Sequence, residues 1–173
     1  MRTLMISAHP EWVEKILNGD KTIEVRHWIP KADLPLEALI YVAKRKPYLY
    51  YIDKSKYEHY GLMSDDELLL AESLTENVSF TKLNGKVVAK FILNKAEEID
   101  WTNEKISFPK TKTMNVVEFA QKTCLLVSDL SKYIKGKVGY AWHIDDLVIF
   151  DNPKELGEFG LTKAPQKMVW IEK

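Results

Sequence analysis

The sequence predicts a mixed α+β fold in which helices cover a small twisted β-barrel. Segments rich in β-forming residues are short and dispersed along the 173 residues, and they do not alternate regularly with helices. An amphipathic helix comes early, and two interruptions, at roughly residues 47–83 and 102–114, separate the later strands. Short, scattered strands favour a barrel over a parallel sheet. The length favours one domain over residues 1–173, with the first interruption as a helical insertion.

The first predicted element is a short helix over residues 10–18. Pro10 suits the first helical position, where its missing N–H is not needed, and Gly19 ends the helix because glycine accepts a left-handed conformation. The apolar positions recur at helical spacing, so we expect them to pack in the core. They are Trp12, Val13, Ile16 and Leu17.

Five further segments have the composition of β-strands. Residues 21–28 alternate apolar and polar side chains, which places the polar ones on one face. Residues 38–44 form a dense run of β-formers and read as a buried strand. Three later strands are predicted at residues 86–93, 140–150 and 168–171.

The two interruptions differ in character. The insertion begins with a tyrosine-rich stretch and passes into a capping-box sequence at Ser64, which predicts a helix through about Leu74. Residues 102–114 read as a loop rich in lysine and threonine.

Two helical stretches complete the predicted elements. Residues 115–135 are expected to form two helices that meet near Ser128, which can cap the second one. A last short helix is expected to begin at Asn152-Pro153 and to end by Gly160.

Charge and composition exclude several classes of protein. Lys and Arg number 25 and Asp and Glu also number 25, so the net charge is zero. Without a long-range basic field, we expect no strong binding of duplex DNA and no membrane partner. The 46% of hydrophobic residues is ample for a packed core and argues against disorder.

Cysteine and histidine usage makes a metal or another cofactor unexpected. Cys124 is the only cysteine, so the chain can form neither an intramolecular disulfide nor a thiolate zinc site. The four histidines show no metal-ligand spacing. The N-terminal apolar run is too short for a signal peptide, and no apolar stretch approaches the ~20 residues that span a bilayer. We expect a soluble, cytoplasmic protein.

One strand concentrates the charges that are most informative about function. Thr22, Glu24 and Arg26 are two residues apart and share a face, while Lys21 lies at the strand mouth and can fold over that face. A carboxylate between two cations stays ionised, and arginine can bind phosphate or a base edge with two hydrogen bonds. The same spacing also occurs on the solvated face of ordinary half-buried strands.

The pattern Gly-x-Lys-x-x-Glu-x-Arg at residues 19–26, directly after an amphipathic helix, resembles the signature of the ASCH domain family, a branch of the PUA-like superfamily. Residues 38–44 and 85–91 resemble the strands that follow it in the family. Residues 140–159 and 164–173 resemble the closing strands of phage- and prophage-borne members. The resemblance therefore covers both ends of the chain and most of its middle.

This resemblance implies a PUA-like β-barrel whose cleft binds RNA, a nucleotide or a modified nucleobase through Lys21, Thr22, Glu24 and Arg26. Glu24 would accept from a base N–H group, and the two cations would hold phosphate or base acceptors. Family enzymes imply an alternative, a hydrolase of an acylated-cytidine type of nucleoside amide or of RNA. Glu24 would then be the catalytic base and Lys21 its electrophilic catalytic partner. The threonine that family amidohydrolases use is replaced here by Glu24, and Thr22 is not at the matching position.

Two residues of the closing strand are further candidate ligand contacts. Trp142 could stack on a base, and His143 could hydrogen-bond a ligand or carry a proton near neutral pH. Both residues also have a structural interpretation. Trp142 could pack in the core, and His143 could lie on a strand face with a backbone hydrogen-bond partner. Asp145-Asp146 is expected to mark a β-bulge or the exposed end of one strand rather than a metal site.

The tyrosine-rich insertion leaves one more alternative open. Lys44-Arg45-Lys46 precedes several tyrosines, and this combination suits single-stranded nucleic acid, with cations for phosphate and rings for bases. The same residues also fit an interpretation without nucleic acid, in which the basic residues are a solvated strand end and the tyrosines pack within the insertion. As a second alternative function, the chain is a protein-interaction adaptor whose contact surface is the insertion.

Overall fold

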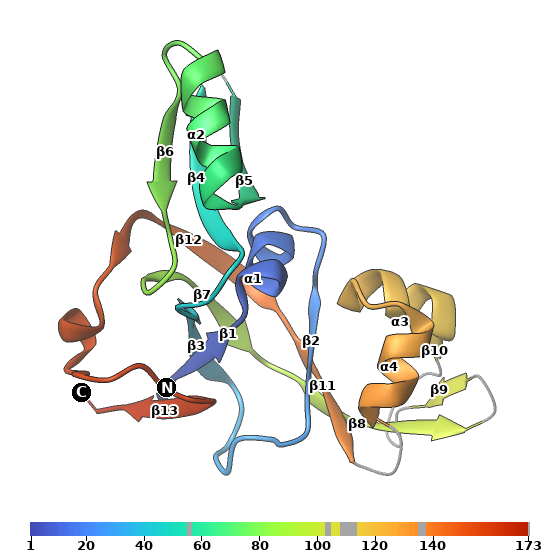
Figure 1. Cartoon of the computed structure of the whole chain (residues 1–173). Coiled ribbons are helices and arrows are strands. Elements are labelled where there is room, and N and C mark those ends of the chain that lie inside the picture. The colour runs from blue at the N-terminus through green and yellow to red at the C-terminus, as the bar shows by residue number, and fades with distance from the viewer. Residues whose placement is uncertain (55–56, 103–104, 108–113, 135–137, 173) are drawn as a thin grey trace.

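The computed structural model describes residues 1–54, 57–102, 105–107, 114–134 and 138–172. Its strands form three sheets, with helices packed at their edges and ends (Figure 1). This arrangement confirms the mixed α+β class. Among the described residues no strand pairing closes a sheet on itself, so the closed barrel is not confirmed.

The central sheet contains β1 (Thr3–Ala8), β3 (Leu36–Val42), β7 (Val87–Leu93), β12 (Asp145–Lys154) and β13 (Met168–Ile171). Their order is β12-β7-β3-β1-β13, in which β1 and β3 are parallel and all other neighbours are antiparallel. Pairing of β1 with β13 brings the two chain ends together (Figure 1). The sheet carries most of the largest core cluster, which also includes the buried face of α1 (Pro10–Leu17).

The second sheet contains β2 (Ile23–Arg26), β8 (Ala96–Thr102), β9 (Lys105–Ser107), β10 (Met114–Asn115) and β11 (Gly139–His143), in the order β10-β9-β8-β11-β2. Helices α3 (Val116–Thr123) and α4 (Val127–Ile134) pack against it. Ile23 and Val25 of β2 join Phe119 and Leu130 of these helices in a separate core cluster. The two apolar side chains of β2 therefore share one buried face, as the alternation of residues 21–28 predicts.

The insertion forms the third sheet, from β4 (Tyr48–Lys54), β5 (Tyr57–Met63) and β6 (Ser79–Lys82), with α2 (Asp65–Leu74) between β5 and β6. Both β5 and β6 are antiparallel to β4 and lie on opposite sides of it, so α2 is the crossover between two parallel strands. The capping box predicted at Ser64 is confirmed. Leu49 is fully buried in the main core, which anchors the insertion at its base.

The predicted closing strand, residues 140–150, is divided into two. β11 ends at His143 and β12 begins at Asp145. Asp146 has a φ of 47°, and the pairing of β12 with β7 shifts between Asp145 and Val148. The acidic pair therefore marks a bulge, as expected, because a left-handed residue breaks the regular strand geometry.

Two helix boundaries differ from the sequence prediction. The junction of α3 and α4 lies at Cys124, whose φ of 55° ends α3, and Ser128 lies within α4 instead of capping it. The last short helix is a 3-10 turn at Leu156–Phe159 that ends at Gly160, whereas residues 152–154 continue β12. Most of the predicted loop at residues 102–114 lies outside the described residues.

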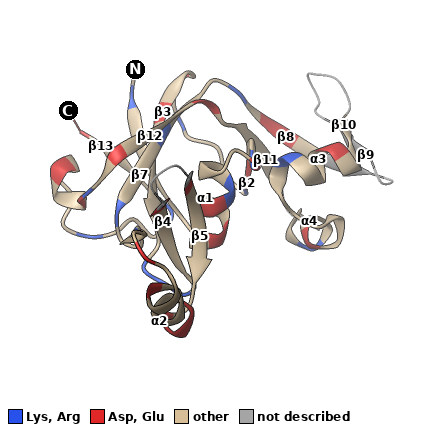
Figure 2. Ribbon diagram, turned by 90° about the horizontal axis from the view of Figure 1, so that it is seen from above, with Lys and Arg blue, Asp and Glu red and all other residues tan. Residues whose placement is uncertain are grey.

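Charged residues of both signs are spread over the molecule, but α2 carries acidic residues and no basic ones (Figure 2). In the part of the chain that the structure describes, no helix has the length and apolar character needed to cross a bilayer.

Candidate functional site

A tight turn after α1 sets the position of Lys21. Gly19 has a φ of 81°, and the backbone N–H groups of Asp20 and Lys21 both donate to the carbonyl oxygen of Lys15, at 2.9 and 3.0 Å. The next N–H, of Thr22, donates to the carbonyl of Lys122 at 2.9 Å, which ties the strand start to α3. The turn therefore directs the Lys21 side chain into the space between β2 and α3, where the residue is only 3% exposed.

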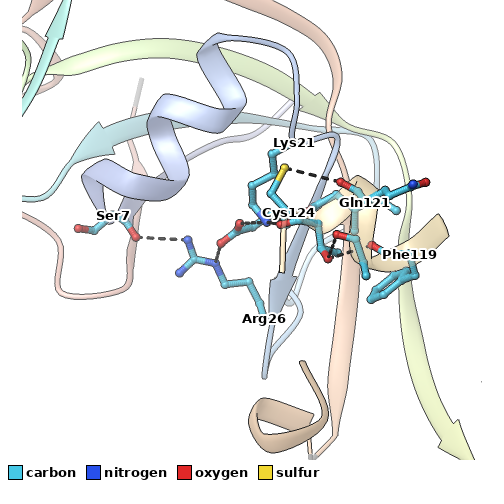
Figure 3. Close-up of polar contacts among 10 residues, drawn as sticks. Ser7, Lys21, Arg26, Phe119, Gln121 and Cys124 are labelled. Atoms are coloured by element: carbon cyan, nitrogen blue, oxygen red, sulfur yellow. Dashed lines mark hydrogen bonds and ion pairs between the residues drawn. The ribbon is translucent and has the colours of Figure 1, made fainter. Parts of the chain in front are cut away.

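The ammonium group of Lys21 is saturated by protein acceptors (Figure 3). Its Nζ donates to the carbonyl oxygens of Ile23 at 2.9 Å and Thr123 at 2.7 Å, and lies 3.3 Å from Oε2 of Glu24. Lysine has three donors, so none remains for a ligand. Lys21 therefore holds Glu24 in place rather than presenting a free charge.

Glu24 lies between two cations. Nε of Arg26 is 2.9 Å from its Oε1, and Nη2 of Arg26 donates to the carbonyl of Ser7 at 3.3 Å. The side chains of Lys21, Glu24 and Arg26 are 2%, 8% and 14% exposed. Lys21 and Glu24 are buried and Arg26 is mostly buried, so they do not form the solvated face of a half-buried strand.

These three residues line one cavity of about 590 Å³, which we call the Glu24 cavity. The other walls come from distant parts of the chain. They include Ser7 of β1, Trp12 of α1, Asp129 and Tyr133 of α4, and Leu125 and Gln166 from loops.

Two aromatic side chains give the cavity stacking surfaces. The Tyr133 ring stacks on His27 with centroids 4.1 Å apart, and burial raises the pKa of its hydroxyl with a smaller contribution from Glu24. The hydroxyl is thus protonated and a hydrogen-bond donor at neutral pH. Trp12 lies with its ring centroid 5.5 Å from Nζ of Lys21. The sequence had assigned Trp12 to core packing alone, yet it lines the cavity.

The other sequence candidates do not line the Glu24 cavity. Thr22 is exposed at the strand mouth. Trp142 is fully buried, and its Nε1 donates to the carbonyl oxygen of Trp28 at 3.2 Å. The two tryptophan rings contact each other edge to face. His143 forms a 2.9 Å contact between Nε2 and Oε2 of Glu97.

Tyr133, Asp129 and Gln166 were missed by sequence reasoning. They lie more than 100 residues after Lys21, and α4 reads as an ordinary amphipathic helix, so no local pattern identifies them. Within the described ranges, no three or more His, Cys, Asp and Glu side chains come together as a metal site.

The ASCH domain model matches residues 6–132 of the chain. The chain belongs to the ASCH domain family. Lys21, Glu24 and Arg26, which belong to the segment that resembles the family signature, line the Glu24 cavity. No curated protein matches the sequence at a significant level.

The fold is similar to the crystal structure of an ASCH protein from Zymomonas mobilis, with a TM-score of 0.57 and 17% identity over 99% of this chain and 88% of that one. Two variants of that protein are similar too. A Tyr-to-Phe variant gives a TM-score of 0.57 at 15% identity, covering 100% and 92% of the two chains. A Ser-to-Ala variant gives 0.55 at 16%, covering 99% and 89%. At these identities the likeness shows a shared fold.

Proposed function

We propose that the Glu24 cavity binds a base of RNA or of a free nucleotide. Membership of the ASCH family, which is generally associated with RNA binding, supports the ligand class. The observation that carries the proposal is the meeting of Glu24, Arg26 and two aromatic rings at the wall of one cavity. Its volume of about 590 Å³ is in the range of small-molecule sites, which suits one nucleotide and not a duplex.

The proposed contacts divide between orientation and stacking. No partner of Arg26 Nη1 is found among the described residues, so this group is available for a base acceptor or a phosphate oxygen. Glu24 accepts from a base N–H, and Lys21 keeps it in position. Trp12 and Tyr133 provide the stacking faces, each worth ~1–3 kcal/mol for a bound base. Thr22, Trp142 and His143 are outside this proposed ligand site.

Binding of a ribonucleotide panel and of a short single-stranded RNA, followed by calorimetry, tests the proposal. Tyr133→Ala and Arg26→Ala are expected to weaken binding by about tenfold each, because they remove a stacking face and a free donor. Arg2→Ala, which removes an arginine away from the Glu24 cavity, is the matched control and should bind like wild type. A wild type that binds no member of the panel, or variants that bind with unchanged affinity, would overturn it.

Hydrolysis at the same cavity is a second candidate function. The observation in its favour is a carboxylate and an ammonium group, those of Glu24 and Lys21, 3.3 Å apart at the cavity wall. Glu24 would activate water for attack on a nucleoside amide of the acylated-cytidine type or on RNA. Turnover by the purified protein that Glu24→Gln abolishes would support it, and absence of turnover would leave binding as the function.

The exposed leucines of α2 favour the adaptor function as a third candidate. Leu69, Leu70 and Leu74 are 65%, 59% and 74% exposed, and no residue of α2 is buried. Acidic residues of the helix, among them Asp66 and Glu72, accompany them, so the fitting partner is a basic polypeptide with apolar side chains.

A pair of synthetic amphipathic helical peptides that differ only in carrying lysine or glutamate tests this candidate. The lysine peptide should bind, and the Leu70→Gln/Leu74→Gln variant should lose that binding. Equal binding of both peptides, or unchanged binding by the variant, would rule it out.

A further inference from the structure

We propose that a second cavity, between the insertion and β12, is a binding site for an alkylammonium group. This cavity of about 440 Å³ shares no lining residue with the Glu24 cavity. We call it the Tyr51 groove. It is walled by Tyr51, Glu58, Tyr60 and Asp151 above a floor that includes Leu83 and Val88. Figure 1 shows β12 passing the foot of the insertion, and residues of β12 line the groove.

Strand pairing explains how these side chains come together. Tyr51 of β4 is directly opposite Tyr60 of β5 and Thr81 of β6, so the three residues form one row across the sheet and share a face. Glu58 lies two residues before Tyr60 on the same face, because side chains alternate along a strand. The central sheet then contributes Asp151 through β12.

The groove combines aromatic walls with an apolar floor. The rings of Tyr51 and Tyr60 have centroids 5.5 Å apart and are tilted by 43°. Leu83 and Val88 are each only 2% exposed. A cation held against the ring faces is attracted by their negative charge distribution. The alkyl chain attached to it would lie on the apolar floor, out of water.

The charges of the groove have one sign. Glu58 and Asp151 are its ionisable carboxylates, and none of the described residues that line it is a Lys, Arg or His. On the flanking strands, Lys82 lies over the ring of Tyr48 and Lys154 bonds to Glu158. These lysines are engaged elsewhere, so the two groove carboxylates lack a counter-ion from them.

The pKa values of the groove tyrosines are raised first by burial and then by the negative charge of Glu58. Desolvation, a hydrogen bond to Glu58 and the charges of Glu58 and Asp53 raise the pKa of Tyr51 to about 12. Burial and the charge of Glu58 raise the pKa of Tyr60 as well. The negative charge of Glu58, which contributes to both shifts, also opposes a bound phosphate, so a nucleotide is the wrong ligand here.

The alkylammonium group could belong to a free amine or to a lysine side chain of a polypeptide. The test uses 1,5-diaminopentane for the first source and Nα-acetyl-lysine methylamide for the second, with the neutral 1-pentanol as a shape control. Binding is followed by backbone NMR shifts. We expect saturable shifts confined to β4, β5 and β12 with at least one of the two amines. A response to 1,5-diaminopentane alone indicates a free amine as the ligand, and a response to the lysine derivative indicates a lysine side chain. The neutral alcohol should bind about tenfold more weakly.

Variants of the full chain distinguish amine binding in the groove from nonspecific attraction of the amines to surface carboxylates. Glu58→Gln and Asp151→Asn are each expected to weaken amine binding about fivefold, because each removes one of the two facing charges. Glu98→Gln, an exposed carboxylate on β8, is the matched control and should bind as wild type. The groove shares no residue with the Glu24 cavity, so this result is independent of the nucleotide proposal.

Three results would overturn the proposal. They are no saturable shift with either amine, equal affinity for 1-pentanol, or unchanged affinity in both carboxamide variants. The two carboxylates are surface groups, so these variants are expected to keep the wild-type unfolding midpoint, which the same samples can report.

Discussion

At the scale of single residues, Lys21 and Glu24 illustrate how a charged cluster is kept inside a protein. Burying an ion is unfavourable unless its hydrogen bonds and its charge are compensated. Lys21 is compensated by two backbone carbonyls and a carboxylate, and Glu24 by two cations. The cluster therefore acts as one unit, and removing one member leaves a buried charge without its partner.

Glu24→Gln is expected to lower the free energy of unfolding by about 3 kcal/mol, because the ammonium of Lys21 stays buried after its carboxylate is lost. Urea unfolding monitored by tryptophan fluorescence measures the change. The exposed Glu98→Gln should shift it by less than about 0.5 kcal/mol. Similar small shifts for both variants would mean that the cluster does not stabilise the fold.

Gly19 is a second residue on which the site depends, because its φ of 81° turns the chain toward Lys21. A Cβ at this position meets nothing within 4 Å, so backbone strain alone opposes a side chain. Gly19→Ala should lower the free energy of unfolding by about 1 kcal/mol. Gly157→Ala, equally open but without a positive φ, is the control and should be near neutral. A neutral Gly19→Ala would contradict the strain argument.

At the scale of elements, α2 is stabilised by its own cap rather than by the core. The Ser64 hydroxyl accepts from the N–H of Glu67 at 3.3 Å, and the Glu67 carboxylate accepts from the N–H of Ser64 at 2.7 Å. The backbone N–H of Ser64 and, to a smaller extent, its side chain lower the pKa of the Glu67 carboxyl below its usual 4.5. Its contribution to stability is therefore present above pH 4.5 and lost as the pH falls through the lowered value.

Ser64→Ala should open α2 by about 1 kcal/mol while leaving the central sheet unchanged, because only the cap is removed. Hydrogen exchange of α2 amides measures this local opening. Glu67→Gln should make α2 protection independent of pH in the acid range where wild type loses it. Equal protection in wild type and Ser64→Ala would show that the cap does not hold the helix.

Which elements could be predicted follows from how local their signals are. The helix α1 and the strands β2 and β7 have a clear period, a stop or a turn pair, and were predicted. β1 was missed because it is apolar on both faces and so shows no alternation. β4 and β5 were missed because their tyrosines and charges resemble a polar loop when cross-strand partners are unknown.

At the scale of the whole molecule, the insertion is anchored at its base and exposed at its helix. Leu49 is fully buried in the main core, and the Asn18 side chain after α1 donates to the Tyr60 carbonyl at 3.0 Å. No residue of α2 is buried. Energetic coupling to the rest of the chain should therefore be large at β4 and small at α2.

Leu49→Ala should cost about 2–5 kcal/mol of unfolding free energy, since it leaves a cavity in the main core. The triple change Leu69→Gln/Leu70→Gln/Leu74→Gln should alter it by less than about 1 kcal/mol, because these side chains are already in water. Chemical denaturation of both variants measures the contrast. A large loss in the triple variant would show that α2 packs on the fold in solution.

The candidate site divides in the same way between local and distant information. Proximity of Lys21, Glu24 and Arg26 was predictable, because a strand places alternate residues on one face and the turn at Gly19 precedes it. Three other facts could not be predicted. The charges are buried, the donors of Lys21 are all used, and Tyr133 and Gln166 complete the cavity wall. Those facts depend on contacts between residues about a hundred positions apart, which leave no periodic trace in the chain.

The sequence alone predicts the local features of this protein through residue spacing. These features are its short strands, its helix caps and the segment that resembles the family signature. Whether a charge on such a strand faces water or a cavity depends on which helix packs over it. Here α3 and α4 pack on Ile23 and Val25 of β2, whereas β1, α1 and α4 line the cavity of the charged residues. Trp142 lies in the main core, and Trp12 lines the cavity. Packing of elements distant in sequence makes that choice, because burial is a property of the assembled surface and not of any segment alone.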